Sequence, residues 1–364
     1  MRTRAKSGLV LARFRLECFA DFPVTGWPLA AAVVPIVPQN PLPSLAEIES
    51  ASALIQASLP VTSCYSWPLI NDRLGCEVWV KHENHQPIGA FKVRGGLVYL
   101  DELLKHEPDV RGVVAASTGN HGQSVAYAAK HRGLKAVIVI PQGNNPEKNQ
   151  AMRSWGAELV NYGSEFQQAL THSYYLAGKE GMHALPSFHP WLVRGVATYA
   201  LEWFRQAPAL DTVFVPIGLG SGICGVAAAR NALGLQTRII GVVSEHAPAY
   251  ALSFQQKRAI SQTSRTQVGE GVACSTPDSM ALAWILEQVA DVVTVSDDEA
   301  ISAIREILQM THNLAEGAGV LGYAALRKNA DAYRGQRVGI VLSGGNARTS
   351  VVAEALRFSI AGRG

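Results

Sequence analysis

The segment "GVVAASTGNHGQSVAYAAKHRGLKAVIVI", Gly112–Ile140, decides the fold class. It begins with an apolar run at 112–116, continues with a helical pattern at 121–132 and ends with a second apolar run at 136–140. Strands that are apolar along their whole length and separated by a helix are typical of a parallel sheet covered on both faces. The segment therefore predicts a β–α–β unit and an α/β fold.

The same alternation extends over most of the chain. Further strands are predicted at "EVWVK" (77–81), "TVFVP" (212–216), "RIIGVV" (238–243), "DVVTV" (291–295) and "RVGIVLS" (337–343). Further helices are predicted at 146–155, 192–205, 223–233, 298–310 and 347–358. Near the start, Ser44 and Glu47 have the spacing of a capping box, which predicts that a helix begins behind Ser44.

Composition excludes several classes of protein. Of 364 residues, 48% are hydrophobic and 17% are charged, as in a folded domain rather than a disordered chain. A formal net charge of +3 is too small to indicate a nucleic-acid partner, and no apolar run reaches the ~20 residues of a membrane span. The cysteines Cys18, Cys64, Cys76, Cys224 and Cys274 are scattered, which argues against a disulfide framework or zinc site and favours a reducing, cytoplasmic setting.

The first 44 residues differ from the rest. "MRTRAKSGLVLARFR" is rich in arginine and poor in acids, and a proline-rich stretch follows. We interpret residues 1–44 as a poorly ordered N-terminal extension, with a targeting segment, a regulatory arm or a wrongly included upstream start codon as the alternatives.

A glycine-rich loop, "PIGLGSGICG" (Pro216–Gly225), lies between a predicted strand and a predicted helix. Backbone amides in such a loop, together with the helix N-terminus, form an anion site that suits a phosphate. Gly220, Gly222 and Gly225 also match GxGxxG, with Glu245 on the next strand, as in a dinucleotide-binding fingerprint. The loop by itself leaves both readings open.

Two more loops follow predicted strands. "ASTGNHGQS" (Ala116–Ser124) places hydroxyls, an amide and free N–H groups at the head of a helix, where a small carboxylate can bind. "LSGGNAR" (Leu342–Arg348) places the hydroxyl of Ser343 at a sheet edge, beside glycines that admit a flat ligand. Ligands in open α/β sheets bind beyond the carboxyl ends of the strands, so these loops can meet at one site.

The lysine of "GAFKVRGGL" (Gly89–Leu97) has an unusual setting. Lys92 lies between Phe91 and Val93 and directly ahead of paired glycines. An amine whose pKa is lowered by desolvation can attack a carbonyl and form a Schiff base. Arg94 is a neighbour that either helps to keep Lys92 deprotonated or serves as a structural ion-pair partner.

Together, these loops fit an aldehyde that carries a phosphate and a ring nitrogen. The lysine binds the aldehyde, the glycine loop binds the phosphate, the serine meets the ring nitrogen and the asparagine loop takes a carboxylate. This combination predicts pyridoxal 5′-phosphate with a small-molecule amino-acid substrate.

At this point the sequence resembles the fold-type II pyridoxal-phosphate enzymes, which are similar to the tryptophan synthase β subunit in fold. The resemblance runs from about residue 45 to 358 and is strongest to the serine/threonine dehydratase (threonine ammonia-lyase) and serine racemase group. It rests on the ordered motifs "KHENHQPIGAFKVRGG", "ASTGNHGQSVAYAA", "PEKNQAMRSWGAELV", "VSDDEA", "AEGAG" and "LSGGN". It implies two open, mostly parallel twisted sheets, with the cofactor between a large domain (45–110 and 190–364) and a small one (111–189).

The resemblance also implies roles for individual residues. Lys92 is the catalytic Schiff-base lysine. The implied cofactor-binding set is Lys92, Phe91, Asn120, Gly218, Leu219, Gly220, Ser221, Gly222, Glu316 and Ser343. The implied substrate-binding set is Ser117, Thr118, Gly119, Asn120 and His121. The implied assembly is a homodimer.

The implied reaction is elimination of water from a β-hydroxy amino acid of the threonine or serine type, giving a 2-oxo acid and ammonia. A racemase of the same group is the alternative, as is a dehydratase for 3-hydroxyaspartate or a compatible-solute breakdown product. Thr118 favours the dehydratase, because racemases of this group have a serine there. The chain departs from the family at Ala90, at the Gly-Leu-Gly-Ser of its phosphate loop and at Ala347–Arg348, and Val243 replaces a cation-binding glutamate, so no metal is expected.

Overall fold

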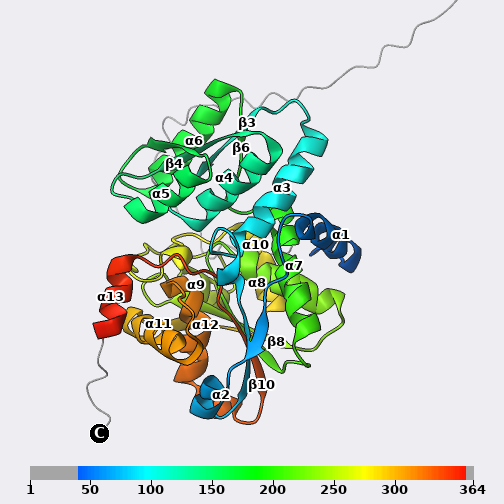
Figure 1. The fold of residues 1–364 in the computed structure, drawn as a ribbon, viewed down its shortest axis with the longest axis vertical. Coiled ribbons are helices and arrows are strands. Elements are labelled where there is room, and N and C mark those ends of the chain that lie inside the picture. Colours follow the sequence, from blue (N-terminus) through cyan, green and yellow to red (C-terminus); the bar gives the residue numbers. More distant parts are fainter. Residues whose placement is uncertain (1–39, 358–364) are drawn as a thin grey trace, which may run out of the picture. The chain divides into compact units, whose positions relative to one another are not determined.

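The computed structural model describes residues 40–357, all of which belong to one unit of the chain (Figure 1). The strands are β1 (Cys64–Ser66), β2 (Glu77–Lys81), β3 (Gly112–Ala116), β4 (Lys135–Ile140), β5 (Glu158–Asn161), β6 (His183–Ala184), β7 (Thr212–Pro216), β8 (Arg238–Ser244), β9 (Asp291–Val295) and β10 (Arg337–Val341). Each strand predicted from an apolar run is present, so the alternation of strands and helices is confirmed.

The helices are α1 (Leu45–Gln56), α2 (Pro68–Leu74), α3 (Lys92–His106), α4 (Asn120–Arg132), α5 (Pro146–Ser154), α6 (Phe166–Glu180), α7 (Pro190–Gln206), α8 (Ser221–Ala232), α9 (Ala249–Gln256), α10 (Ser279–Gln288), α11 (Asp297–Thr311), α12 (Gly317–Lys328) and α13 (Thr349–Arg357). Three short 3₁₀ helices are η1 (Glu83–His85), η2 (Glu270–Val272) and η3 (Ala330–Tyr333). The capping box ahead of α1 is formed as predicted, with the Ser44 hydroxyl accepting from the Glu47 N–H and the Glu47 carboxylate accepting from the Ser44 N–H.

The strands form two sheets. The larger has the order β1-β2-β10-β7-β8-β9, and the smaller has the order β5-β4-β3-β6. All neighbouring strands are parallel except β1 and β2, which are antiparallel. The predicted fold class, two mostly parallel sheets flanked by helices, is therefore confirmed.

Helices cover both faces of the larger sheet. Along β7, Val213 and Val215 pack against the core beneath α1, α7, α8 and α10, whereas Phe214 packs against the core beneath α11 and α12. Successive side chains of a strand point to opposite faces, so a strand buried on both faces is apolar at every position. This explains why the strands read as continuous apolar runs rather than alternating ones.

The smaller sheet is covered in the same way. Ile138 of β4 packs with α3 and α4, and its neighbours Val137 and Val139 pack with α6 (cyan to green in Figure 1). Its strands lie between residues 112 and 184, inside the range of the predicted small domain. The domain limits themselves stay a prediction, and residues 1–39 of the predicted extension lie outside the described residues.

The sequence patterns missed the short strands and extended one too far. β1, β5 and β6 have only two to four residues, none of which is buried, so they give no clear period. The strand predicted over 337–343 ends at Val341, because the chain then turns toward the lysine loop, where the Ser343 carbonyl accepts a hydrogen bond from the Phe91 N–H at 3.1 Å.

Candidate active site

Lys92 is the first residue of α3, and its amine reaches a second helix. Nζ donates a hydrogen bond of 3.0 Å to Oγ of Ser221, the first residue of α8, and lies 5.0 Å from the centre of the Phe91 ring. Burial lowers the pKa of this amine to about 8. Near neutral pH, a far larger fraction of Lys92 is therefore neutral and nucleophilic than of a solvated lysine.

Arg94 acts as a structural ion-pair partner rather than as the group that deprotonates Lys92. Its guanidinium is fully buried and lies 2.8 Å from oxygens of both Glu83 and Glu202. Lys81 binds the same Glu202 at 2.9 Å, so the cluster joins two cations with two carboxylates. The low pKa of Lys92 results from burial. The contacts of Arg94 therefore support its role as a structural ion-pair partner.

The glycine loop brings the end of β7 to the head of α8. Gly220 has φ +104°, and a Cβ there would lie 2.7 Å from Cβ of Ala281. The Tyr250 hydroxyl donates to the Leu219 carbonyl at 2.9 Å, and the Leu219 side chain packs against the apolar core. No side chain caps α8, so the first N–H groups of this helix are the natural anion ligands of the predicted phosphate site.

We expect Gly220→Ala to destabilise the protein by about 1–3 kcal/mol, because the position requires a left-handed backbone and has no room for a methyl group. The affinity for pyridoxal phosphate should fall in parallel. The matched control is Gly234→Ala beyond the other end of α8, where φ is +66° but no atom lies within 4 Å of the added Cβ. Equal losses in thermal unfolding for the two variants would contradict the steric argument.

The asparagine loop connects β3 to α4. Oγ of Ser117 accepts hydrogen bonds from the N–H groups of Gly119 (3.2 Å) and Gly122 (2.8 Å), so this serine shapes the loop and keeps only its hydroxyl proton for a ligand. Thr118 and Asn120 are half-buried in the same loop. The loop also reaches the lysine helix, because the Ser124 hydroxyl donates to the Lys92 carbonyl at 2.6 Å.

His121 is a neutral side chain close to Lys92. Burial, and to a smaller extent the charge of Lys92, lowers the pKa of its imidazole to about 3. Its Nε2 atom is buried and has no hydrogen-bond partner among residues 40–357. A buried polar atom without a partner is rare and marks a place where a ligand can bind.

The loop after β10 joins the lysine loop and the asparagine loop. The Ser343 carbonyl binds the Phe91 N–H, and Ala90 forms a β-bridge with Gly344. Asn346 donates to the side-chain oxygen of Asn120 at 2.8 Å, and the Asn120 amide donates to Glu316, the N-cap residue of α12. The four predicted loops are thus connected through hydrogen bonds.

A charged network beside these loops was not predicted from the sequence. The buried amine of Lys148, in α5, lies 2.8 Å from Glu270 and 3.4 Å from Glu316, and Arg348 pairs with Glu270. Lys148 also lies against Gly119 of the asparagine loop. The partners come from four separate segments, so no local pattern could have indicated them.

These residues fit pyridoxal phosphate. One amine with a low pKa lies at the head of a helix with uncapped N–H groups, which matches an aldehyde and a phosphate carried on one small ring. A Cβ on Gly222 would lie 3.6 Å from the Phe91 ring, so the glycine loop and the aromatic ring face each other. Lys92 and the amides of the α8 N-terminus would hold the cofactor.

The dinucleotide alternative finds less support. Glu245, its ribose ligand, is exposed and lies 3.7 Å from His246. Gly225, the third glycine, lets α8 approach α7, because a Cβ there would lie 3.0 Å from the Ala197 nitrogen. The glycine is therefore used for helix packing.

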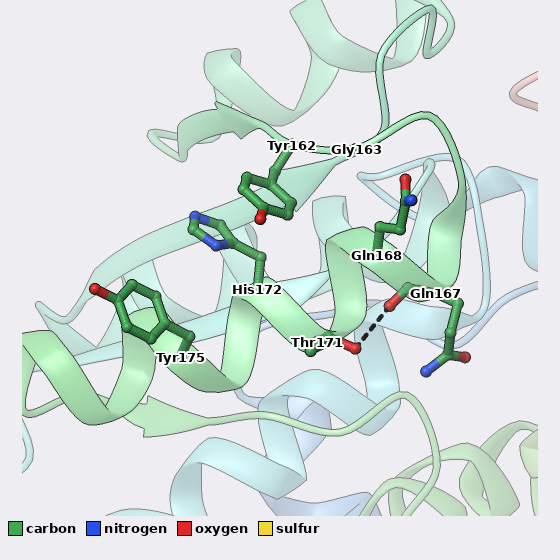
Figure 2. A pocket seen from close by; sticks show the side chains of 7 residues that line it. All are labelled: Tyr162, Gly163, Gln167, Gln168, Thr171, His172 and Tyr175. Atoms are coloured by element: carbon green, nitrogen blue, oxygen red, sulfur yellow. Dashed lines mark hydrogen bonds between the residues drawn. The ribbon is translucent and has the colours of Figure 1, made fainter.

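A depression of about 600 Å³ lies elsewhere, on the surface beside β5 and α6. Figure 2 shows its lining, in which the rings of Tyr162 and His172 stack at 3.7 Å and Tyr175 lies further along the helix. The lining has no lysine and no carboxylate, so it lacks the groups that the predicted chemistry needs.

Among residues 40–357, no helix is long and apolar enough to cross a membrane, and no cluster of three or more His, Cys, Asp or Glu side chains is arranged to hold a metal ion.

Comparisons with known proteins identify the family of this chain. The family model described as pyridoxal-phosphate dependent enzyme matches residues 55–344. An L-threonine ammonia-lyase of Thermotoga maritima is 31% identical over 85% of this chain and 77% of its own length. A biosynthetic L-threonine dehydratase of Haemophilus influenzae is 31% identical over 84% of this chain, which spans 61% of that relative's length.

The fold has solved counterparts as well. The processed form of threonine deaminase isoform 2 from Solanum lycopersicum superposes with a TM-score of 0.79 and 28% identity, covering 90% of this chain and 99% of that one. The chain therefore belongs to the family of pyridoxal-phosphate dependent enzymes.

Proposed function

We propose that this protein is a pyridoxal-phosphate dependent ammonia-lyase that removes water from a β-hydroxy amino acid of the threonine or serine type. The observation that carries the proposal is the buried Lys92 amine, whose pKa is lowered to about 8. Its Nζ lies 3.0 Å from Oγ of Ser221, the first residue of α8. The similarity to an L-threonine ammonia-lyase over most of the chain supports the same reaction.

The residues would divide the work as follows. The N–H groups at the start of α8 bind the phosphate, the loop from Ser117 to His121 binds the substrate carboxylate, and Ser343 and Asn120 orient the ring. When bound, the cofactor supplies an electron sink for the carbanion that forms at Cα. The free amine of Lys92 would take the Cα proton as a general base.

The reaction balances without a further reactant. The proton at Cα moves to Lys92 and is then passed to the departing β-hydroxyl, which leaves as water. Hydrolysis of the resulting enamine product takes up one water and releases ammonia, so the net change is a β-hydroxy amino acid to a 2-oxo acid and ammonia.

The test is release of 2-oxo acid from cofactor-loaded protein with the L- and D-forms of serine, threonine and 3-hydroxyaspartate. We expect one or two of these substrates to react and the others to react at least tenfold more slowly. Hydrogen exchange at Cα without release of a 2-oxo acid would identify a racemase instead. If cofactor-loaded protein released no 2-oxo acid from any of these substrates, the dehydratase proposal would be wrong.

We also propose that the protein is a cytoplasmic homodimer. The four cysteines among the described residues, Cys64, Cys76, Cys224 and Cys274, are all free, which suits a reducing compartment. Mass measurement by light scattering at micromolar concentration tests the assembly, and a mass equal to one 39.0 kDa chain would contradict it.

A further inference from the structure

Ser221 stands where the resemblance to the family implies a glycine. The phosphate loop reads Gly-Leu-Gly-Ser from Gly218 to Ser221, so the chain places a hydroxyl at the last position. That side chain is 2% exposed, and its Oγ lies 3.0 Å from the amine of Lys92. A glycine has no atom that could make this contact.

Two serines hold Lys92 at its two ends. The Ser124 hydroxyl, on α4, donates to the Lys92 backbone carbonyl at 2.6 Å, and the Ser221 hydroxyl, on α8, accepts from the Lys92 amine. The close approach of α3 and α4 allows the Ser124 contact, because Gly96 has no Cβ to displace Ser124. The lysine side chain is therefore fixed by its backbone and by its nitrogen.

We propose that Ser221 is a positioning residue for the Lys92 base: its hydroxyl oxygen holds the free amine near the head of α8 and stabilises the ammonium that forms when Lys92 takes the Cα proton. This inference rests on the proposed function. The C–H electron pair stays on the substrate carbon, the proton bonds to Nζ, and Ser221 accepts a hydrogen bond without giving up its own proton.

The neighbouring titratable groups His121 and Arg94 do not stabilise the ammonium of Lys92. His121, on α4, is neutral because its pKa is lowered to about 3. Arg94, on the same helix as Lys92, is neutralised by Glu83 of η1 and Glu202 of α7. A hydroxyl that accepts from the amine favours its protonated form and so opposes the effect of burial on the pKa.

The first measurement needs no turnover. Full-length protein freed of cofactor is mixed with pyridoxal, which lacks the phosphate, and the rate of capture is followed by visible absorbance across pH 6–10. The neutral amine is the nucleophile, so the midpoint of this profile reports the pKa of Lys92, about 8 in the wild type. In Ser221→Ala, the ammonium loses an acceptor, and we expect the midpoint to fall by about one pH unit.

The second measurement uses the loaded enzyme and the best substrate of the panel. We expect kcat of Ser221→Ala to fall roughly 10- to 100-fold with little change in KM, because the hydrogen bond matters most after the proton has moved. The primary isotope effect with Cα-deuterated substrate should rise, since proton removal becomes slower. Ser221→Thr, which keeps the hydroxyl, should restore both the midpoint and the isotope effect.

Ser124→Ala is the matched control, because it removes a hydroxyl from the backbone end of the same lysine. It should leave the pyridoxal midpoint within about 0.3 pH units of the wild type, an effect too small for a hydrogen bond to the amine. An unchanged midpoint and isotope effect in Ser221→Ala would overturn the inference while the dehydratase proposal stands. A shifted midpoint in a protein that releases no 2-oxo acid would keep the role of Ser221 and reject the proposed reaction.

Discussion

Lys92→Ala should abolish both covalent capture of the cofactor and turnover, with 2-oxo acid release falling at least ~10³-fold. The variant loses the amine that we propose forms the Schiff base and removes the Cα proton. Folding should be affected much less, because the alanine keeps the start of α3 intact. Visible absorbance after desalting, and product release at saturating substrate, measure the two losses separately.

Two controls sharpen this result. Lys92→Arg keeps the positive charge but offers no neutral nitrogen near pH 7, so it should be as inactive as the alanine variant. Lys105→Ala removes an amine from the last turn of the same helix, where the side chain is 60% exposed, and should leave activity unchanged. If Lys92→Ala kept the colour of a bound cofactor, another amine would hold it, and Lys148 beside Gly119 would be the next candidate.

Arg94→Met should destabilise the protein by roughly 3–5 kcal/mol. The substitution leaves Glu83, which is fully buried, without its guanidinium partner, and Glu202 with Lys81 only. Breaking a buried ion pair from one side costs more than the pair contributes, because an uncompensated charge remains in a low-dielectric interior. Since a domain of this kind is stable by only about 5–15 kcal/mol, the loss should be evident in urea unfolding.

The double variant Arg94→Met/Glu83→Met should be more stable than Arg94→Met alone. It removes one cation together with one carboxylate and retains the Lys81–Glu202 pair at 2.9 Å. Arg334→Met, which breaks the exposed pair with Asp331, should change stability by less than about 0.5 kcal/mol. If the double variant were no more stable than the single one, the loss would come from packing and not from unpaired charge.

The strands and helices were largely predictable, because their patterns are local. β7 and β8 are buried on both faces and read as unbroken apolar runs, and Ser44 and Glu47 form their cap within one turn of chain. The short β5 was not predictable in this way, because it lies at the edge of its sheet and its residues are only partly buried. A strand that buries neither face consistently has no hydrophobic periodicity in its sequence.

The candidate site was predictable in its parts. The glycines around Gly220, the lysine between two apolar residues and the serine in the loop after β10 each indicate a local chemical property. We expected these loops to lie close together because loops at the carboxyl ends of parallel strands share one edge of a sheet. The structure brings them together, with Lys92 touching Ser221 and Phe91 touching Ser343.

The sequence by itself determined the order of elements and the position of the loops, and it indicated Lys92 as the candidate Schiff-base lysine, because neighbouring residues encode these features. The tertiary structure alone decided the partners. Ser221 meets Lys92 across 129 residues, Glu202 meets Arg94 across 108, and Glu316 meets Asn120 across 196. Such contacts depend on how helices pack on sheets, and burial by that packing sets the pKa of Lys92. No local pattern specifies them.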